Sequence, residues 1–478
     1  QAIERSFQFQ NNTILCGLKT EYAELLADMP PLDIHAPLTD NFNYLFNYIT
    51  TNKLPPFYIT IDEYDNFANQ LIVSHRDELY RELTADEGFL KTFFKTLKKG
   101  RELGAIANIF ITGVLPITID DLASGFNVAN FLTLNPEFES MLGFTQSEVD
   151  QLLDEIYQDY GFDPATRQEV NTIIKNNYDG YRFVNDEGEQ LYNSTILMYF
   201  LWHFTRQGAI PEFLTDMNLR TDLSWVRRIT GSIAENTAAF IEQLTTENCI
   251  AYDRNMLTTK FNMSQFFQPD FYPISFFYLG MLTKQDRFLL RLPNLNMRQI
   301  FVEYLNELNH IYVSTSYAKL MRVFARHPNL EALFAVYWDL YVSQFPAAIF
   351  QKVNENFYRT TFFELCSRYL SFLFTWNVER SYPQGSSDLE FVGKYHEQYA
   401  GLRWVIEFKY YSNAEFKKLN TKIENFQLQS EDTKQIAGYV EGLRGEYPEA
   451  RISQYVIYCF GNKGFRVFQV AETSGVIQ

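Results

Sequence analysis

Two apolar segments near the C-terminal end of the chain constrain its fold more than any other feature. Residues 388–392 and 402–411 have the composition of β-strands, and only the polar loop 393–401 separates them. Strands with so short a connection form a hairpin, in which facing residues are equally far from the middle of the loop. Because this loop centres on position 397, the residue that faces Glu407 lies within about one position of Asp388.

Side chains alternate between the two faces of a strand, so Lys409 projects on the same side as Glu407. Two carboxylates and an ammonium group are therefore expected together in a solvent-facing cluster. Like charges that face each other destabilise a sheet unless a cation compensates them. Carboxylate oxygens bind Mg²⁺ or Mn²⁺, and such an ion can polarise a phosphodiester while a lysine supports the developing charge. The cluster fits metal-dependent hydrolysis of phosphodiesters.

The pattern Glu-x-Lys is a weak signal by itself, because the chain contains it twice. The second copy, Glu415-Phe-Lys417, is expected in the first turn of a helix with Asn413 as its N-cap. The first copy, at 407–409, has the alternative of an ordinary pair of charges on an exposed strand. Its apolar surroundings, the facing acid and a polar helix downstream favour a functional site.

The distribution of charge limits where a nucleic acid can bind. The chain has a formal charge of −17, whereas residues 346–478 contain 15 Lys and Arg against 15 Asp and Glu. The whole excess of acid thus lies in residues 1–345. Since phosphate contacts require Lys and Arg, the C-terminal segment is the part of the chain that can approach a nucleic acid.

Length and composition indicate a folded protein of two or three domains. The chain has 478 residues, of which 46% are hydrophobic and 17% aromatic. Its four cysteines form neither a CxxC pair nor a cluster at zinc-ligand spacing. No apolar run is long enough to cross a membrane, and no signal-peptide pattern is visible. A cytoplasmic protein without a membrane partner is the default expectation.

Three parts of different character follow one another along the chain. Residues 1–145 begin with a strand-like segment at 6–9, and they contain buried apolar strands at 57–62 and 107–113 with a helix at 87–97 between them. This order of elements predicts a parallel α/β sheet.

Residues 146–345 carry apolar side chains at helical spacing and few strand signals, which predicts a mostly helical lid and linker region. In residues 346–478, helices are expected at 357–373 and 431–443. Beyond the hairpin, strands are expected in the same part at 452–460 and 465–470. The last part is therefore predicted to be a compact α/β domain.

These C-terminal features resemble the PD-(D/E)XK nuclease superfamily, in the version fused to an AAA-ATPase-like domain. The motifs that carry the resemblance are Gly385-Ser-Ser-Asp388, Val405-Ile-Glu407-Phe-Lys409 and Gln435-Ile-Ala-Gly-Tyr439. The resemblance implies a restriction-endonuclease-like α/β fold over 346–478. It also implies Asp388 and Glu407 as ligands of Mg²⁺ or Mn²⁺, Lys409 as the catalytic lysine, and Gln435 as an auxiliary active-site residue.

Glu364 stands at the place of the acid that the superfamily carries on the preceding helix. An ion pair with Arg368, one helical turn further on, explains Glu364 equally well. For Gln435 the alternative is an ordinary polar position on a helix. The resemblance further implies a nucleic-acid substrate, with DNA favoured over RNA, and leaves a homo-oligomer open.

Asp62 and Glu63 form a second acidic pair, directly after a predicted strand. In nucleotide-binding α/β folds such acids hold magnesium through water and orient the attacking water, although an acidic helix N-cap is the alternative. The region resembles an AAA-ATPase-like domain with a partial P-loop NTPase-like parallel sheet. That resemblance makes Asp62 and Glu63 the Walker B acids and Thr112 a sensor-like residue. Its further segments lie at 109–114, 125–127, 141–148, 178–183 and 191–193.

The phosphate loop of such an ATPase is not visible in the sequence. The loop has the pattern G-x-x-x-x-G-K-[ST], whose backbone N–H groups hold the phosphates. Before Asp62 the chain has a single glycine, Gly17, which lacks the first glycine and the adjacent lysine of the pattern. ATP is thus expected as a cofactor only with a phosphate loop upstream of Gln1, and otherwise the ATPase is degenerate.

The predicted function is a metal-dependent nuclease that an attached AAA-like domain regulates. The alternative is a protein that binds nucleic acid without cutting it, or a nucleotide-gated switch that acts on a partner. Together, Asp388, Glu407 and Lys409 favour chemistry, because a binding protein would not need opposed acids.

Overall fold

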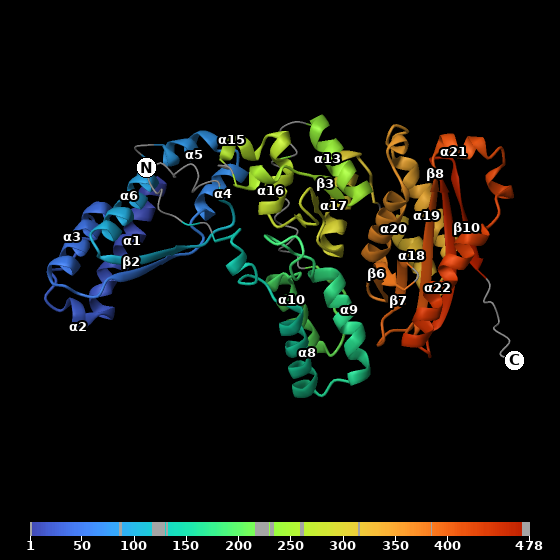
Figure 1. Cartoon of the computed structure of the whole chain (residues 1–478), viewed down its shortest axis with the longest axis horizontal. Coiled ribbons are helices and arrows are strands. Elements are labelled where there is room, and N and C mark those ends of the chain that lie inside the picture. Colours follow the sequence, from blue (N-terminus) through green and yellow to red (C-terminus); the bar gives the residue numbers. More distant parts are fainter. Residues whose placement is uncertain are drawn as a thin grey trace. The chain divides into compact units, whose positions relative to one another are not determined.

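The computed structural model describes residues 2–85, 88–116, 130, 132–215, 229, 234–258, 262–313, 316–383 and 385–470. The chain forms two compact units, which are coloured along the sequence in Figure 1. The first consists of Gln1–Leu132 with Asp253–Gly280, and the second of Thr133–Tyr252 with Met281–Gln478. The division of the chain at 145 and 345 stays a prediction. No described helix is both long enough and apolar enough to cross a membrane.

The first unit combines helices with a parallel pair of strands. Its elements are α1 (Ala2–Glu21), α2 (Ala23–Leu26), α3 (Leu38–Thr51), β1 (Phe57–Ile61), α4 (Asn66–Val73), α5 (Asp77–Thr84), α6 (Phe89–Glu102), β2 (Ile106–Ile111), α14 (Arg254–Thr258), α15 (Met263–Phe266) and α16 (Tyr272–Tyr278). β1 and β2 pair in parallel, and α6 lies between them in sequence, so the predicted strand, helix, strand order is confirmed.

Two expectations for this unit are wrong. The strand-like segment at 6–9 belongs to α1, where the ring of Phe7 packs against Phe89 and Phe93 of α6 at centroid distances of 5.2 Å. An alternation of four residues is too short to distinguish a strand from a helix. The strands are also not buried on both faces, because Tyr58 is 80% exposed and Phe110 is exposed as well.

The second unit begins with the predicted helical region. Among the described residues, its α-helices before the C-terminal domain are α8 (Gln146–Tyr160), α9 (Arg167–Tyr178), α10 (Ser194–Gln207), α13 (Ala234–Glu247), α17 (Leu295–Leu308), α18 (Ser316–Arg326) and α19 (Leu330–Leu340). A capping box between Thr145 and Glu148 precedes α8, and Gly161 follows its last residue as a left-handed C-cap with a φ of 66°. A small antiparallel sheet, ordered β3-β5-β4, lies in the same region and consists of β3 (Cys249–Ala251), β4 (Thr283–Lys284) and β5 (Leu289–Arg291).

The C-terminal domain is built on a five-stranded sheet with the order β10-β9-β8-β7-β6. The strands are β6 (Phe374–Tyr382), β7 (Gly385–Gly393), β8 (Leu402–Tyr411), β9 (Arg451–Phe460) and β10 (Gly464–Val470). Neighbouring strands are antiparallel except β8 and β9, which are parallel and connected through helix α22 (Ser430–Glu446). A parallel pair needs such a crossover connection.

Helices cover both faces of this sheet. On one face, Tyr439 and Val440 of α22 pack in one core with Val405 of β8. On the other face, Phe362 of α20 (Glu355–Leu370) contacts the ring of Phe408. Phe408 is three positions after Val405 on β8, and residues an odd number of positions apart point to opposite faces of a sheet. Figure 1 shows α20 and α22 beside the strands. Glu407 and Lys409 are two and four positions after Val405, so their side chains lie on the same face of the sheet as Val405, the face that α22 covers.

Candidate active site

β7 and β8 form the predicted hairpin, and their register places the two predicted acids opposite each other. Leu389 pairs with Ile406 in the last pair of this ladder, and Asp388 and Glu407 are the next residues on the two strands. The regular ladder ends at that step, because Oδ2 of Asp388 accepts the backbone N–H of Phe408 at 2.7 Å. The carboxylate thus takes the place of a strand carbonyl, and this bond holds it at the point where the regular ladder ends.

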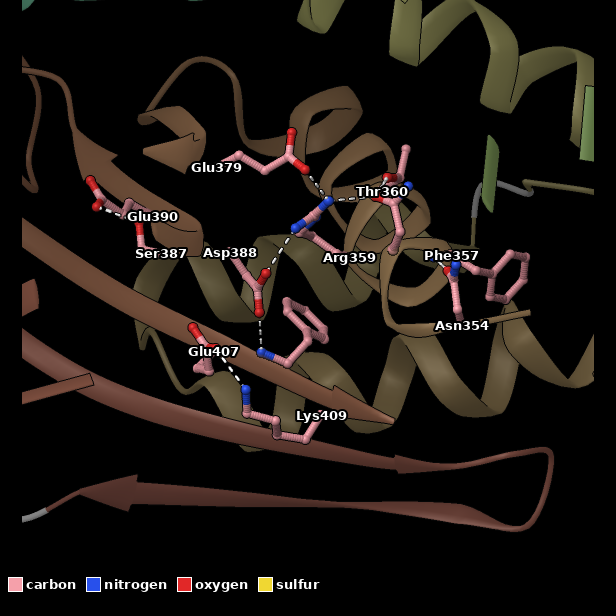
Figure 2. Close-up of polar contacts among 12 residues, drawn as sticks. Asn354, Phe357, Arg359, Thr360, Glu379, Ser387, Asp388, Glu390, Glu407 and Lys409 are labelled. Carbon is pink, nitrogen blue, oxygen red and sulfur yellow. Dashed lines mark hydrogen bonds and ion pairs between the residues drawn. The ribbon is translucent and has the colours of Figure 1, made fainter. Parts of the chain in front are cut away.

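Lys409 and Gln435 surround one oxygen of the second acid. Lys409 Nζ donates to Glu407 Oε1 at 2.8 Å and to Gln435 Oε1 at 3.2 Å. Gln435 Nε2, on α22, donates to the same Glu407 oxygen at 2.6 Å and to the Tyr439 hydroxyl at 2.6 Å. Figure 2 shows Lys409 pointing at Glu407 beneath Asp388. The structure therefore brings together four of the five residues predicted for the nuclease site, namely Asp388, Glu407, Lys409 and Gln435.

The fifth, Glu364, makes the alternative contact that its sequence position allows. Its Oε1 accepts Nε of Arg368 at 2.9 Å, which is the expected pair one turn apart. The acid of α20 whose charge acts on the cluster is Glu355, in the first turn of the helix after the N-cap Asn354. Sequence analysis did not single out Glu355. The available signal was an acid directly after a helix N-cap, two and a half turns before Glu364.

Burial and the charge of Asp388 disfavour ionisation of Glu407 and Glu355. Burial raises the pKa of Glu407 to about 8, with a further contribution from the charge of Asp388. Burial and the same charge raise the pKa of Glu355 to about 7. Asp388 also has a raised pKa through burial, although Arg359 and the Phe408 N–H counteract the rise. A cation bound at these carboxyl groups would offset both their burial and their mutual repulsion, and so favour their ionised forms.

Comparison with known protein families agrees with this geometry. Residues 353–469 match the family model of the PD-(D/E)XK nuclease superfamily. These residues form a domain of the PD-(D/E)XK nuclease superfamily. Residues 1–123 match the family model of a predicted AAA-ATPase, so both domain resemblances are confirmed. The AAA-like segments from 125 to 193 lie beyond this match. No curated protein and no solved structure gives a match to the chain. The PD-(D/E)XK domain supports a nuclease-type hydrolase with a nucleic-acid substrate.

The carboxyl groups of Asp388 and Glu407 are buried, so the expectation of a solvent-facing cluster is wrong. Asp388 is 7% exposed and Glu407 is 3% exposed. A sequence shows that residues share a face of a sheet but not which helix covers that face. Here Gln435 of α22 bonds Glu407 and Arg359 of α20 bonds Asp388, so both helices contribute to the burial of the two acids.

A buried arginine holds the second oxygen of Asp388. Arg359 Nη1, from α20, donates to Asp388 Oδ1 at 2.8 Å, and its Nη2 donates to Glu379 Oε1 at 2.7 Å (Figure 2). Glu379 interrupts β6 with a φ of 54°, a conformation that costs a non-glycine residue energy. Although burial opposes ionisation, the charges of Arg298 and Arg359 lower the pKa of Glu379 to about 2. No local sequence pattern indicates this network.

The donor set of the PD-(D/E)XK domain fits a small divalent cation. Glu407 Oε2 is buried and has no hydrogen-bond partner among the described residues. In the described ranges no three His, Cys, Asp or Glu side chains lie together as a complete metal-binding group. Mg²⁺ is usually held by one or two carboxylates, with water and substrate phosphate oxygens as the other ligands. Two opposed carboxylates with one unpartnered oxygen match that mode of binding.

The second Glu-x-Lys copy begins a helix, as predicted. α21 (Asn413–Lys418) starts with a capping box in which Ser412 accepts the N–H of Glu415 and the Glu415 carboxylate accepts the N–H of Ser412. The N-cap is Ser412, and the assignment of Asn413 as the cap is wrong by one residue. Serine at this position allows the reciprocal pair with an acid three residues later.

The three residues predicted for the nucleotide site also lie together. Asp62 and Glu63 follow β1, and the Thr112 hydroxyl, just after β2, donates to Asp62 Oδ1. Asp65, which was not predicted as a separate feature, is fully buried and accepts the backbone N–H groups of Val114 and Leu115 at 2.7 to 3.1 Å. Asp65 therefore ties the loops after the two strands to each other. The segment at 125–127 lies outside the described residues.

Proposed function

We propose that the PD-(D/E)XK domain is a divalent-metal-dependent nuclease with its centre at Asp388, Glu407 and Lys409. The observation that supports this most is the pair of opposed, buried carboxylates beside a lysine. Such an arrangement costs folding free energy, because burial and mutual repulsion both oppose ionisation of the acids. A protein that only binds nucleic acid gains nothing from that cost.

The residues of the centre have distinct proposed roles. Asp388 and Glu407 hold the cation, and Glu355 adds a third carboxyl at the start of α20. A cation at these carboxylates would supply charge stabilisation for the phosphodiester and for the attacking water. Gln435 bonds both Glu407 and Lys409, so it fixes the orientation of each relative to the other.

Lys409 is proposed to support the developing negative charge of the phosphodiester. Burial lowers the pKa of its ammonium group, but the hydrogen bond and charge of Glu407 and the charges of Glu355 and Asp432 raise it, and the net pKa lies above the ordinary value. Lys409 therefore stays protonated at neutral pH. Its Nζ is 3.9 Å from the Asp432 carboxylate, which helps to hold the side chain in place.

The AAA-like domain is proposed to regulate this nuclease. Asp62, Glu63 and Thr112 lie at the carboxyl ends of two parallel strands, which is where α/β folds bind nucleotides. Acids alone repel a triphosphate, so ATP binding would also need a glycine-rich phosphate loop. Regulation by nucleotide is thus tied to the presence of that loop.

The test is cleavage of end-labelled single-stranded DNA, duplex DNA and RNA by the purified chain. We expect cleavage with Mg²⁺ or Mn²⁺, none in EDTA, and recovery when the cation is restored, with DNA cut faster than RNA. Cleavage that persists in EDTA would rule out the metal-dependent mechanism. Binding of nucleic acid without cleavage under any of these conditions would favour the non-cutting alternative.

A further inference from the structure

Three arginines of the helical region lie close together in the second unit. The Arg182 N–H donates to the Thr283 hydroxyl at 2.6 Å, and Thr283 pairs with Arg291 across the β4–β5 ladder. Arg291 comes three residues before Asn294, the N-cap of α17, and the first turns of that helix carry Arg298. Backbone contacts therefore bring together side chains from three separate segments.

The segment 178–183, which sequence analysis noted only as part of a resemblance, is what makes this arrangement possible. Gly180 has a φ of 112°, and a Cβ atom there would lie 2.1 Å from the carbonyl oxygen of Pro293. Only glycine permits so close an approach. Asn294 Nδ2 also donates to the Asp179 carbonyl at 3.0 Å. The loop is thereby pressed against the start of α17, with Arg182 beside Arg291 and Arg298.

Several guanidinium nitrogens of this group lack partners. Arg298 is 8% exposed, and its Nε and Nη1 are buried with no hydrogen-bond partner among the described residues. Nε of Arg182 is likewise buried and has no hydrogen-bond partner in the described part of the chain. Burial of guanidinium nitrogens without hydrogen-bond partners is costly, so these nitrogens favour an anion that would bond them.

The acids near the arginines do not balance them. Glu379 is shared between Arg298, whose Nη2 lies 2.5 Å from Oε2, and Arg359. Burial raises the pKa of Asp179, whose carboxylate accepts the N–H of Gly180. Burial lowers the pKa of Arg291, and the charges of Arg298 and Arg182 lower it further, as expected for crowded cations. Asp186 is engaged by Lys284 and Arg287.

We propose that Arg182, Arg291 and Arg298 form a phosphate-binding subsite for the nucleic-acid strand that the nuclease centre cuts. Guanidinium groups suit phosphate because their planar donors match its oxygens. The inference rests on the proposed nuclease function, and it adds a second point of contact for the same substrate. The side chain of Glu379 is 40% exposed, so solvent reaches the edge of this group.

The subsite is connected to the nuclease centre by consecutive ion pairs. Arg298 binds Glu379, Glu379 binds Arg359, and Arg359 binds Asp388 at 2.8 Å. The proposed phosphate position at the three arginines and the proposed phosphate position at Asp388 are therefore linked through Glu379 and Arg359. A strand that contacted both places would be fixed in position before cleavage.

The test compares oligonucleotide binding by the parent chain and by Arg291→Gln, measured by fluorescence anisotropy in EDTA over a range of salt concentrations. Loss of one phosphate contact is expected to raise Kd about tenfold and to reduce the slope of log K against log salt by about 1. Arg182→Gln should behave in the same way. Arg291→Lys keeps the charge and should keep the slope. Thermal unfolding of each variant verifies that it is folded.

The matched control is Arg287→Gln. It removes the same charge four residues away, from a side chain that is 73% exposed and paired with Asp186, so Kd and slope should stay at the parent values. If Arg291→Gln and Arg182→Gln both keep the parent slope, the subsite is wrong while the nuclease proposal stands. A parent chain that neither binds nor cuts nucleic acid overturns the nuclease proposal itself. Stabilisation by inorganic phosphate with unchanged oligonucleotide binding would assign the arginines to a free anion and overturn the strand subsite.

Discussion

Replacing Glu407 by glutamine is expected to lower the rate of metal-dependent cleavage by on the order of a thousandfold, because a cation ligand supplies several kcal/mol of transition-state stabilisation. Glutamine keeps the shape of the side chain, and its amide oxygen can still accept from Lys409. The pKa of about 8 means that the neutral form of Glu407 is already accommodated near neutral pH without a cation. The folded structure should therefore persist, which thermal unfolding would verify.

Glu415→Gln is the matched control for this experiment, since it makes the same change in the second Glu-x-Lys copy. Glu415 is exposed and caps a helix. Its variant should cleave at the parent rate. Full activity of Glu407→Gln, or loss of activity in Glu415→Gln, would show that the centre has been assigned to the wrong residues.

Replacing Arg359 by glutamine is expected to lower the free energy of unfolding by about 3–5 kcal/mol, because it removes one partner of buried ion pairs. Arg359 is 6% exposed and serves both Asp388 and Glu379. Without it, Asp388 faces Glu407 and Glu355 with no neighbouring guanidinium. Urea unfolding of the metal-free protein, followed by circular dichroism, measures the difference.

A second substitution distinguishes loss of charge compensation from loss of packing. In the Arg359→Gln background, Asp388→Asn removes the carboxylate that was left unpaired. The double variant should recover part of the lost free energy of unfolding. If the double variant is no more stable than Arg359→Gln alone, the ion pair with Asp388 does not account for the destabilisation.

The hairpin at the nuclease centre could be predicted because it depends on local rules. A short symmetric loop fixes the register, and alternation along β8 places Lys409 beside Glu407. The acid on α20 could not be chosen in the same way. Glu355 and Glu364 lie on one helix, and which of them reaches the sheet depends on how α20 packs against β7 and β8.

Contacts between segments that are far apart in the sequence could not be predicted, because they depend on the tertiary fold. Arg298 and Glu379 are 81 residues apart, and no spacing rule relates them. The glycine of segment 178–183 illustrates the same limit. A glycine is required at position 180 because the Pro293 carbonyl lies against it, and this contact is visible only in the folded structure. The prediction of a strand at 6–9 was wrong because four residues are too few to distinguish the spacing of a strand from that of a helix.

The central claim is that Asp388 and Glu407 together bind the catalytic cation. Anomalous diffraction from crystals of the protein soaked in Mn²⁺ tests it most directly. The account predicts one anomalous peak at roughly 2.0–2.3 Å from an oxygen of each carboxylate, with no peak at that position in Glu407→Gln crystals. An active, EDTA-sensitive protein whose crystals show no Mn²⁺ between Asp388 and Glu407, or show it only elsewhere, would contradict the account.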